Sequence, residues 1–324
     1  MNTLSDIGER KAIELIKTII PSDDLVVSLI DDCGVVDLDD SYILVTTDMM
    51  SKQTHIPPNM TPWQIGWFIV AINLSDIAAK GGTPTGFVLS LGLPKEYGVR
   101  DFKKLIQGAK HCLQTFQCPL IGGDTKENQS ITLCGTAIGM VSKTDFMSRI
   151  GARPGDLVAV TGTLGKAGAG YYSIHHHLDK QEMKQALLEP TPRINAGRLL
   201  ASTKKVHCCM DLSDGLSSSL YQLGTLNDVG FLIEENQLPK SAFLNTIKTL
   251  DPSFSVLDTV LHFGGDYELL LTCSPKDYSL LEDVIQPLSL SLNAIGQVTE
   301  SKDIYLKHKK GSTILPDEGY EHFT

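Results

Sequence analysis

The residues that could do chemistry are mainly aspartates, placed at the ends of predicted strands or in glycine-rich turns. They are Asp31, Asp32, Asp48, Asp76, Asp124, Asp211 and Asp214. Carboxylates that converge without a counter-charge repel one another, which raises their pKa values and costs stability. Several divalent cations would resolve that conflict. Ligand sets made of oxygen atoms, with few His or Cys, favour Mg²⁺ or Mn²⁺ over Zn²⁺.

Each of these aspartates also has an ordinary structural explanation. Asp is a common turn former and a common helix N-cap. For any single Asp that explanation is the stronger one, whereas the recurrence of Asp in similar strand-end positions favours a metal site. The residues alone leave both explanations open.

Two segments could contact phosphate. The segment Gly122-Gly123-Asp124-Thr125 is expected to be a glycine turn whose backbone N–H groups approach a phosphate while Asp124 holds a metal. Arg149 lies just before the predicted domain boundary and is either a phosphate clamp or a surface arginine. The pair Gly165-Lys166 does not complete a P-loop, because Ala167 stands where that pattern needs Ser or Thr.

Other conspicuous residues favour structural roles. His175, His176 and His177 are adjacent and cannot share one helix face, so they are expected to be solvated. Trp63 and Trp67 are one helical turn apart and are expected in the core. The seven cysteines have no C-x-x-C spacing, which argues against a zinc site and against a disulfide framework.

The composition indicates a globular, cytoplasmic protein. The 324 residues are 42% hydrophobic and carry a net charge of −10, which argues against disorder and against general binding to nucleic acid. The longest stretch without Asp, Glu, Lys or Arg covers residues 53–75, and its apolar part is too short to span a bilayer. The N-terminus lacks the pattern of a signal peptide. We therefore expect neither a nucleic acid nor a membrane as a partner.

Hydrophobic periodicity predicts alternating helices and strands in both halves of the chain. Helices are predicted at 5–20, 61–81, 100–116, after 165, from about 192, and at 213–223. Strands are predicted at 26–30, 42–46, 87–93, 119–121, 131–141, 157–160, 208–212, 231–233, 269–272 and 293–297. The alternation does not follow a strict βαβ rhythm, so we expect an α+β protein with mixed sheets. Length and the Gly-Ala-Arg-Pro-Gly segment at 151–155 predict two domains, residues 1–148 and 149–324.

Taken together and in order, the motifs resemble those of the thiamine-monophosphate kinase family, within the aminoimidazole-ribonucleotide synthetase-like superfamily. The resemblance covers nearly the whole chain. The matching segments are 31–36, 46–50 with His55, 73–79, 121–125, 149–156, 190–193, 210–216, 264–270 and 319–323.

This resemblance implies direct in-line transfer of the γ-phosphoryl group of ATP to thiamine monophosphate, without a phospho-enzyme, in a homodimer joined through its N-terminal sheets. It implies several Mg²⁺ ions held by Asp31, Asp32, Thr46, Thr47, Asp48, Asp76, Asp124, Asp211 and Asp214. It implies nucleotide contacts from Thr46, Thr47, Gly122, Gly123, Arg149 and Ser213. It implies acceptor contacts from His55, Asp211 and Tyr320, and catalytic roles for Asp124, Asp214 and Arg149.

Some positions depart from the family pattern. Ile30 stands in place of a Gly, Ser51–Gln53 in place of Val-Glu-Gly, and Gly265 in place of a Glu. The alternatives are an ATP-dependent enzyme of the same superfamily with another acceptor, and a non-catalytic nucleotide-binding relative. The relatives that use a C-terminal or an N-terminal cysteine are disfavoured, because the first cysteine of this chain is Cys33 and the chain ends Phe323-Thr324.

Overall fold

The structure is a computed structural model that describes residues 3–20 and 31–323. The strand predicted at 26–30, and with it Ile30, lies outside the described residues. The helix predicted at 5–20 consists of a 3₁₀ turn, η1 (Leu4–Asp6), followed by α1 (Gly8–Ile19).

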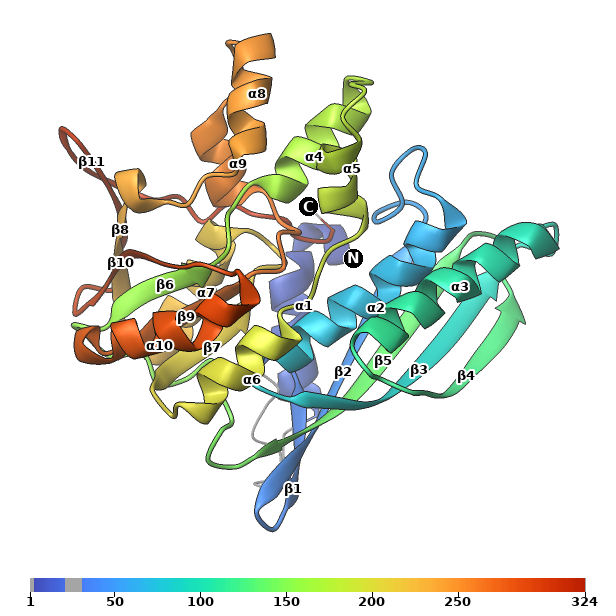
Figure 1. Cartoon of the computed structure of the whole chain (residues 1–324), viewed down its shortest axis with the longest axis horizontal. Helices are drawn as coiled ribbons and strands as arrows, with labels where there is room; N and C mark the ends of the chain where they lie inside the picture. The colour runs from blue at the N-terminus through green and yellow to red at the C-terminus, as the bar shows by residue number, and fades with distance from the viewer. Residues whose placement is uncertain (1–2, 21–30, 324) are drawn as a thin grey trace.

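The first half of the chain builds a five-stranded sheet. Its strands are β1 (Gly34–Leu38), β2 (Ser41–Ser51), β3 (Thr83–Leu93), β4 (Leu120–Glu127) and β5 (Thr132–Ser142). Their order is β1-β2-β5-β3-β4, and only β3 and β4 run parallel. Helices α2 (Pro62–Ala79) and α3 (Val99–Thr115) cover one face of this sheet (Figure 1).

Helix α2 is buried on nearly all sides. It begins as predicted: Gln64 N donates to the Thr61 hydroxyl at 3.2 Å, and Pro62 occupies the first helical position. Fourteen of its 18 residues are buried. A helix that is apolar all round belongs between layers, and α2 indeed contacts both the first sheet and elements of the second half.

The second half builds a seven-stranded mixed sheet. Its strands are β6 (Leu157–Thr161), β7 (Val206–Asp211), β8 (Gly230–Glu234), β9 (Leu269–Cys273), β10 (Leu292–Thr299), β11 (Ile304–His308) and β12 (Gly311–Ile314). Their order is β12-β11-β8-β10-β6-β9-β7, with only β8 and β11 parallel. The α+β prediction with mixed sheets is confirmed.

Seven helices accompany the second sheet (Figure 1). They are α4 (Lys166–His175), α5 (Gln181–Leu188), α6 (Ile194–Ser202), α7 (Leu216–Asn227), α8 (Ala242–Leu250), α9 (Val256–His262) and α10 (Tyr278–Ile285), with short 3₁₀ turns η2 (Glu235–Gln237), η3 (Pro275–Asp277) and η4 (Gln286–Leu288). His175, His176 and His177 are exposed at and beyond the end of α4, as expected. Within the described residues, no helix is both long enough and apolar enough to cross a membrane.

The two halves contact each other at several places, including a buried hydrophobic cluster and an ion pair. One buried hydrophobic cluster includes Ile69 and Leu74 of α2 together with Leu200 of α6 and Cys209 of β7. Helix α1 packs beside the C-terminal segment (Figure 1), where Arg10 forms a 2.7 Å ion pair with Asp317. The hydrophobic cluster and the ion pair both hold together elements of the two halves, and the site described below lies between these elements.

Two predicted local structures are wrong. Residues 122–125 are not a glycine turn but the middle of β4, paired with β3. A Cβ on Gly123 would lie 2.2 Å from Leu89 O, so close strand packing, and not a turn, requires this glycine. The helix predicted from Ser213 begins only at Leu216, because Gly215 takes a φ of +100° and keeps residues 213–215 in a loop.

Candidate active site

Buried and half-buried carboxylates meet between the two halves of the chain. They come from the segment before β1 (Asp31, Asp32), from β2 (Asp48), from α2 (Asp76), and from the end of β7 and the loop after it (Asp211, Asp214). One carboxylate oxygen each from Asp32, Asp76 and Asp211 lie within 4.8 Å of one another. The structure therefore brings together aspartates that are as far apart in the sequence as Asp31 and Asp214.

One turn of α2 organises this cluster. The Thr46 hydroxyl donates to Asp76 Oδ2 at 2.6 Å, which joins β2 to the helix. The Ser75 hydroxyl donates to Asp211 Oδ2 at 2.6 Å, which joins the helix to β7. Because neighbouring residues of a helix point about 100° apart, Ser75 and Asp76 reach these two strands from adjacent positions.

The backbone of β2 is tied to the same turn. Asn73 Oδ1 accepts a hydrogen bond from Asp48 N at 3.1 Å, and its Nδ2 donates to Ile69 O at 2.8 Å. The Asn73 amide is fully buried and has a partner at each end. It therefore fixes the position of Asp48 relative to Asp76.

Burial and mutual repulsion raise the pKa values of the clustered carboxyls. Burial, together with Asp214, raises the pKa of Asp48 to about 6, and burial, together with Asp32, raises the pKa of Asp211 to about 7. The pKa of Asp76 lies well above its ordinary value, first because of burial and then because of Asp48. Burial and Glu9 also raise the pKa of Asp214. A divalent cation would reverse these shifts by favouring the ionised form.

The donor set fits such a cation. The Asp32 side chain is 0% exposed, and its Oδ2 accepts no directed hydrogen bond from the described residues, although Lys80 Nζ lies 2.8 Å away. Buried carboxylate oxygens are seldom left without a hydrogen bond unless an ion or water completes them. Three close carboxylates without His or Cys match the preference of Mg²⁺ for oxygen ligands.

Arg149 belongs to this site and is not a surface arginine. Its side chain is 17% exposed, and its Nε donates to Asp32 Oδ1 at 2.8 Å. Nη2 contacts the same oxygen. Burial alone would lower the pKa of the Arg149 guanidinium, but the charge of Asp32 outweighs burial and raises it. The guanidinium therefore stays charged.

Lys80 is a second buried cation that the sequence analysis did not single out. Its Nζ lies 2.5 Å from Asp31 Oδ1 and 2.7 Å from Cys209 O. Burial alone would lower the pKa of Lys80, but the charges of Asp32 and Asp31 outweigh burial and raise it. Burial alone would raise the pKa of Asp31, but Lys80 outweighs burial and lowers it. The one sequence feature that could have indicated a buried lysine is its position directly after a long apolar helix.

The predicted acceptor residues His55 and Tyr320 lie near each other. The rings of His55 and His322 are 5.6 Å apart, and Tyr320 Oη lies 3.3 Å from His322 Nδ1. Tyr320 N donates to Asp214 O at 3.1 Å, which ties this group to the acidic cluster. Burial and His322 lower the pKa of His55 to about 4, so its imidazole is neutral. His322 was missing from the predicted site residues.

Other predicted residues lie outside the buried cluster. Gly122, Gly123 and Asp124 are exposed on β4. Across the sheet, Asp124 stands in one row with Ser90, Cys134 and Met49, whereas Asp48 belongs to the next row. Side chains in adjacent rows point to opposite faces, so Asp124 and Asp48 face away from each other.

Thr47 and Ser213 are also apart from the three-oxygen cluster. Thr47 is exposed on the same face as Asp124, and its hydroxyl donates to Gly135 O at 2.8 Å. Ser213 lies in the loop after β7, where its carbonyl accepts from Gly265 N at 2.7 Å. The unusual Gly265 has a φ of +91°, a conformation that side-chain-bearing residues rarely adopt.

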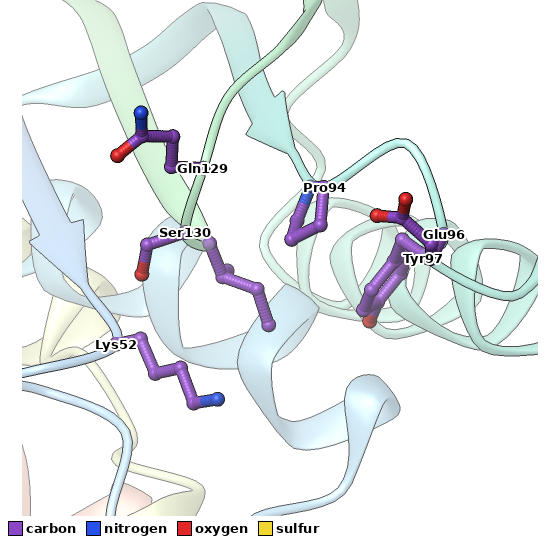
Figure 2. A pocket seen from close by; sticks show the side chains of 7 residues that line it. Lys52, Pro94, Glu96, Tyr97, Gln129 and Ser130 are labelled. Carbon is purple, nitrogen blue, oxygen red and sulfur yellow. The ribbon is translucent and has the colours of Figure 1, made fainter.

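A cavity of about 360 Å³ lies at the far end of β2 (Figure 2). Its lining residues are Lys52, Pro94, Glu96, Tyr97, Gln129, Ser130 and Ile131. Lys52 belongs to the segment 51–53 that departs from the family pattern. None of the predicted site residues lines this cavity.

Family models match both halves of the chain. The N-terminal domain of AIR synthase related protein matches residues 30–141, and its C-terminal domain matches residues 153–309. The thiamine-monophosphate kinase of Methanospirillum hungatei is 33% identical over 317 residues, which cover 97% of this chain and 99% of the relative. The enzyme of the same name from Haemophilus influenzae is 35% identical over 320 residues, which cover 94% of each chain.

Solved structures agree with the sequence relatives. A structure described as AaThiL complexed with AMPPCP and TMP superposes with a TM-score of 0.88 and 28% identity, and the match covers 99% of each chain. Escherichia coli HypE, a hydrogenase maturation protein, shares the fold with a TM-score of 0.73 at 17% identity, covering 95% of this chain and 97% of HypE. This chain therefore belongs to the thiamine-monophosphate kinase family of AIR synthase related proteins.

Proposed function

We propose that this protein transfers the γ-phosphoryl group of ATP to thiamine monophosphate, giving thiamine diphosphate and ADP. The observation that carries the proposal is the buried cluster of Asp32, Asp76 and Asp211 beside Arg149, in a chain that matches thiamine-monophosphate kinases over nearly its full length. A relative of the same fold is described with AMPPCP and TMP. AMPPCP is an analogue of ATP.

The main task at such a site is to hold negative charge. Transfer between two phosphate groups brings several negative oxygens together, and catalysis rests on positioning and charge neutralisation. Mg²⁺ would be held by Asp32, Asp76 and Asp211, with Asp48 and Asp214 beside them, and would neutralise phosphate oxygens when bound. Arg149 donates to Asp32 and thus supplies a permanent positive charge at the same place.

The acceptor itself provides the nucleophile. An oxygen of the thiamine monophosphate phosphate forms the new P–O bond as the bond from Pγ to the bridging oxygen of ADP breaks. Burial raises the pKa values of the nearby Cys33 and Cys209 thiols well above their ordinary value, so neither thiol is a ready nucleophile. These features support direct in-line transfer without a phospho-enzyme.

The neutral imidazole of His55, with Tyr320 beside it, offers an aromatic surface for the cationic thiamine ring. His55 and His322 lie 5.6 Å apart, and a neutral histidine does not repel a positive ligand. Asp211 belongs to the acidic cluster, to which Tyr320 is tied through its hydrogen bond to Asp214 O. We assign acceptor binding to these residues on this basis.

We also propose that two copies pair through the uncovered face of the first sheet. Large apolar side chains on this sheet are half exposed or more, among them Val36 (54%), Met49 (66%) and Ile121 (56%). Several large apolar side chains exposed on one sheet are typical of an interface. Thr47 and Asp124 share this face, so their proposed contacts with nucleotide and metal would form beside a second copy.

All seven cysteines are unpaired, which fits a reducing compartment and supports a cytoplasmic location.

The direct test is a product assay. Purified protein is incubated with ATP, Mg²⁺ and thiamine monophosphate, and the nucleotides and thiamine species are separated by chromatography. Equal amounts of ADP and thiamine diphosphate, both abolished by EDTA, are expected. ADP without thiamine diphosphate would indicate another acceptor, and ATP binding without any turnover would indicate a non-catalytic relative.

A further inference from the structure

Lys80 is a buried charge that the phosphoryl transfer described above does not use. It directly follows the last residue of α2, and its side chain is 0% exposed. Among the described residues it is the only lysine that is fully buried. Burying an ammonium costs several kcal/mol unless close partners compensate for the lost water, so this lysine needs an explanation.

Three oxygens surround the Lys80 ammonium. Asp31 Oδ1 lies at 2.5 Å, Cys209 O at 2.7 Å and Asp32 Oδ2 at 2.8 Å. Nζ donates hydrogen bonds to Asp31 Oδ1 and Cys209 O, and Asp32 Oδ2 adds an ion-pair contact without a directed hydrogen bond. Two carboxylates and a carbonyl around one positive charge resemble the oxygen shell of a bound cation.

The backbone holds this ammonium in place. The chain reverses directly after α2, where Gly81 adopts a φ of +71° and Gly82 N donates to Ile77 O at 2.9 Å. This is the hydrogen-bond pattern of a Schellman helix end. The position of Lys80 is therefore set by the end of α2, the same helix that carries Asp76.

Asp31 is saturated by groups of the protein itself. Its Oδ1 accepts from Lys80 Nζ and, at 3.0 Å, from Asp32 N. Its Oδ2 accepts from the Ser148 hydroxyl at 2.9 Å and from Arg149 N at 3.0 Å. Two oxygens offer about four lone-pair positions, so no position remains for a divalent ion.

The three clustered carboxylates differ from Asp31. Asp76 and Asp211 each accept one hydrogen bond from a hydroxyl, those of Thr46 and Ser75. Asp32 Oδ1 accepts from Arg149 Nε, whereas its Oδ2 has the ion-pair contact with Lys80 but accepts no directed hydrogen bond from the described residues. These carboxylates keep lone pairs for a metal, and Asp31 does not belong to their cluster.

We propose that Lys80 is a tethered cation that takes the place of a divalent ion at Asp31 and assembles the acidic site before metal binds. Asp31 then serves as an anchor for Lys80 and for the segment 148–149, and not as a metal ligand. This inference rests on the proposed metal site, but it does not depend on which acceptor the protein uses. It replaces the ligand role that the family resemblance implied for Asp31.

The first experiment compares Lys80→Met with wild type in the full-length protein after EDTA treatment. The melting temperature of the metal-free variant should fall by about 10 °C, because a buried carboxylate pair loses its cation. Asp31→Asn in the Lys80→Met background should recover part of this loss, since it removes one of the unpaired charges. Lys302→Met is the control, because Lys302 is 72% exposed in a surface pair. A double variant no more stable than Lys80→Met alone would overturn the proposal.

The second experiment counts metal ions and does not depend on how Lys80→Met folds. Isothermal titration with Mn²⁺, without ATP or thiamine monophosphate, is performed on wild type, Asp31→Asn and Asp32→Asn. Asp31→Asn should keep the Mn²⁺ stoichiometry and stay within about threefold of the wild-type affinity, whereas Asp32→Asn should lose at least about tenfold. Loss of a Mn²⁺ site in Asp31→Asn would overturn the proposal. Because no substrate is present, this result is independent of the product assay that tests the proposed function.

Discussion

Asp211 occupies the position where three elements meet. It ends β7, accepts from Ser75 of α2, and lies within the cluster formed with Asp32 and Asp76. Asp211→Asn keeps the size of the side chain and its hydrogen bond but removes the charge. We expect kcat to fall by about 10²–10³ and Mn²⁺ affinity by at least about tenfold, with an unchanged circular dichroism spectrum. The control is Asp179→Asn, at an exposed aspartate. Near-normal turnover in Asp211→Asn would contradict the role assigned to Asp211.

The raised pKa values predict how pH affects the metal-free protein. In the unfolded chain these carboxyls ionise near pH 4, whereas in the folded protein Asp48 and Asp211 ionise at about 6 and about 7. Between those values the folded state binds more protons than the unfolded state. The stability of the metal-free protein should therefore fall as the pH rises from about 4 to about 7.

Melting temperatures in EDTA at several pH values test this expectation. The decline should be shallower in Asp48→Asn, which cannot ionise at that position. Mn²⁺ affinity should change in the opposite direction and increase with pH, because the ligands must lose their protons. Parallel stability curves for wild type and Asp48→Asn would show that the carboxyl of Asp48 is not the source.

His55 should affect the acceptor and not the nucleotide. Its neutral ring lies 5.6 Å from the ring of His322, which in turn lies 4.9 Å from the ring of Tyr320. We expect His55→Ala to raise KM for thiamine monophosphate by about tenfold, a loss of about 1.4 kcal/mol, while KM for ATP stays within about twofold. Steady-state kinetics with each substrate varied in turn measures both values. His177→Ala, at an exposed histidine, is the control. An effect of His55→Ala confined to KM for ATP would show that His55 does not bind the acceptor.

At the scale of elements, α2 and α3 approach each other through a pair of glycines. A Cβ on Gly66 of α2 would lie 1.9 Å from Leu105 O, and a Cβ on Gly108 of α3 would lie 1.8 Å from Trp63 O. Gly108→Ala must therefore push the helices apart, at a cost of about 1–3 kcal/mol. Urea unfolding measures this loss of stability. The control is Gly98→Ala, whose added Cβ would lie 3.8 Å from the carboxylate of Asp101. It should lower the free energy of unfolding by less than about 1 kcal/mol. Equal costs would show that the two helices are not in close contact.

Helix α2 could be predicted from the sequence because its signals are local. Thr61 and Pro62 mark its start, a long apolar run forms its body, and Gly81-Gly82 marks its end. Strand β4 could not be predicted in full, because Gly122, Gly123 and Asp124 are typical turn residues. Its structure depends on hydrogen bonds to β3, whose Ser90 pairs with Asp124 although 34 positions separate them. Local propensity gives no sign of such a pairing.

The same distinction applies to the site. The aspartates could be identified because their residue type and strand-end positions are visible in the sequence. The sequence could not show that Asp124 faces away from Asp48, because a shift of one residue in strand register moves a side chain to the opposite face of the sheet. Lys80 was missed because the tertiary structure buries it, next to Asp31, Asp32 and Cys209, whereas a lysine at a helix end is ordinarily exposed.

At the scale of the whole molecule, the uncovered face of the first sheet predicts a dimer. Met140 lies on this face in one row with Ile43 and Val36 and is 43% exposed. Met140→Asp should convert the protein from a dimer to a monomer of 35.3 kDa, because a charge would be buried in an apolar interface. Light scattering after size-exclusion chromatography gives the mass. Leu250→Asp, on the exposed side of α8, is the control, and a wild-type protein that is monomeric would contradict the expected pairing.

The arrangement of the two halves explains why the site needs the whole chain. Asp48 and Asp76 belong to the first half, Asp211 and Asp214 to the second, and α2 packs against both. Neither half contains the complete set of carboxylates. The near-full coverage of the thiamine-monophosphate kinases by this chain agrees with a site built from both halves.

A single-turnover rapid-quench experiment tests direct phosphoryl transfer from ATP to thiamine monophosphate. Excess protein is mixed with Mg²⁺, thiamine monophosphate and ATP labelled in the γ-phosphoryl group, and the label is followed in each species. We expect labelled thiamine diphosphate to form in one phase, at the rate at which ADP appears, with no label on the protein. Label that passes through the protein, or ADP that forms without labelled thiamine diphosphate, would contradict it.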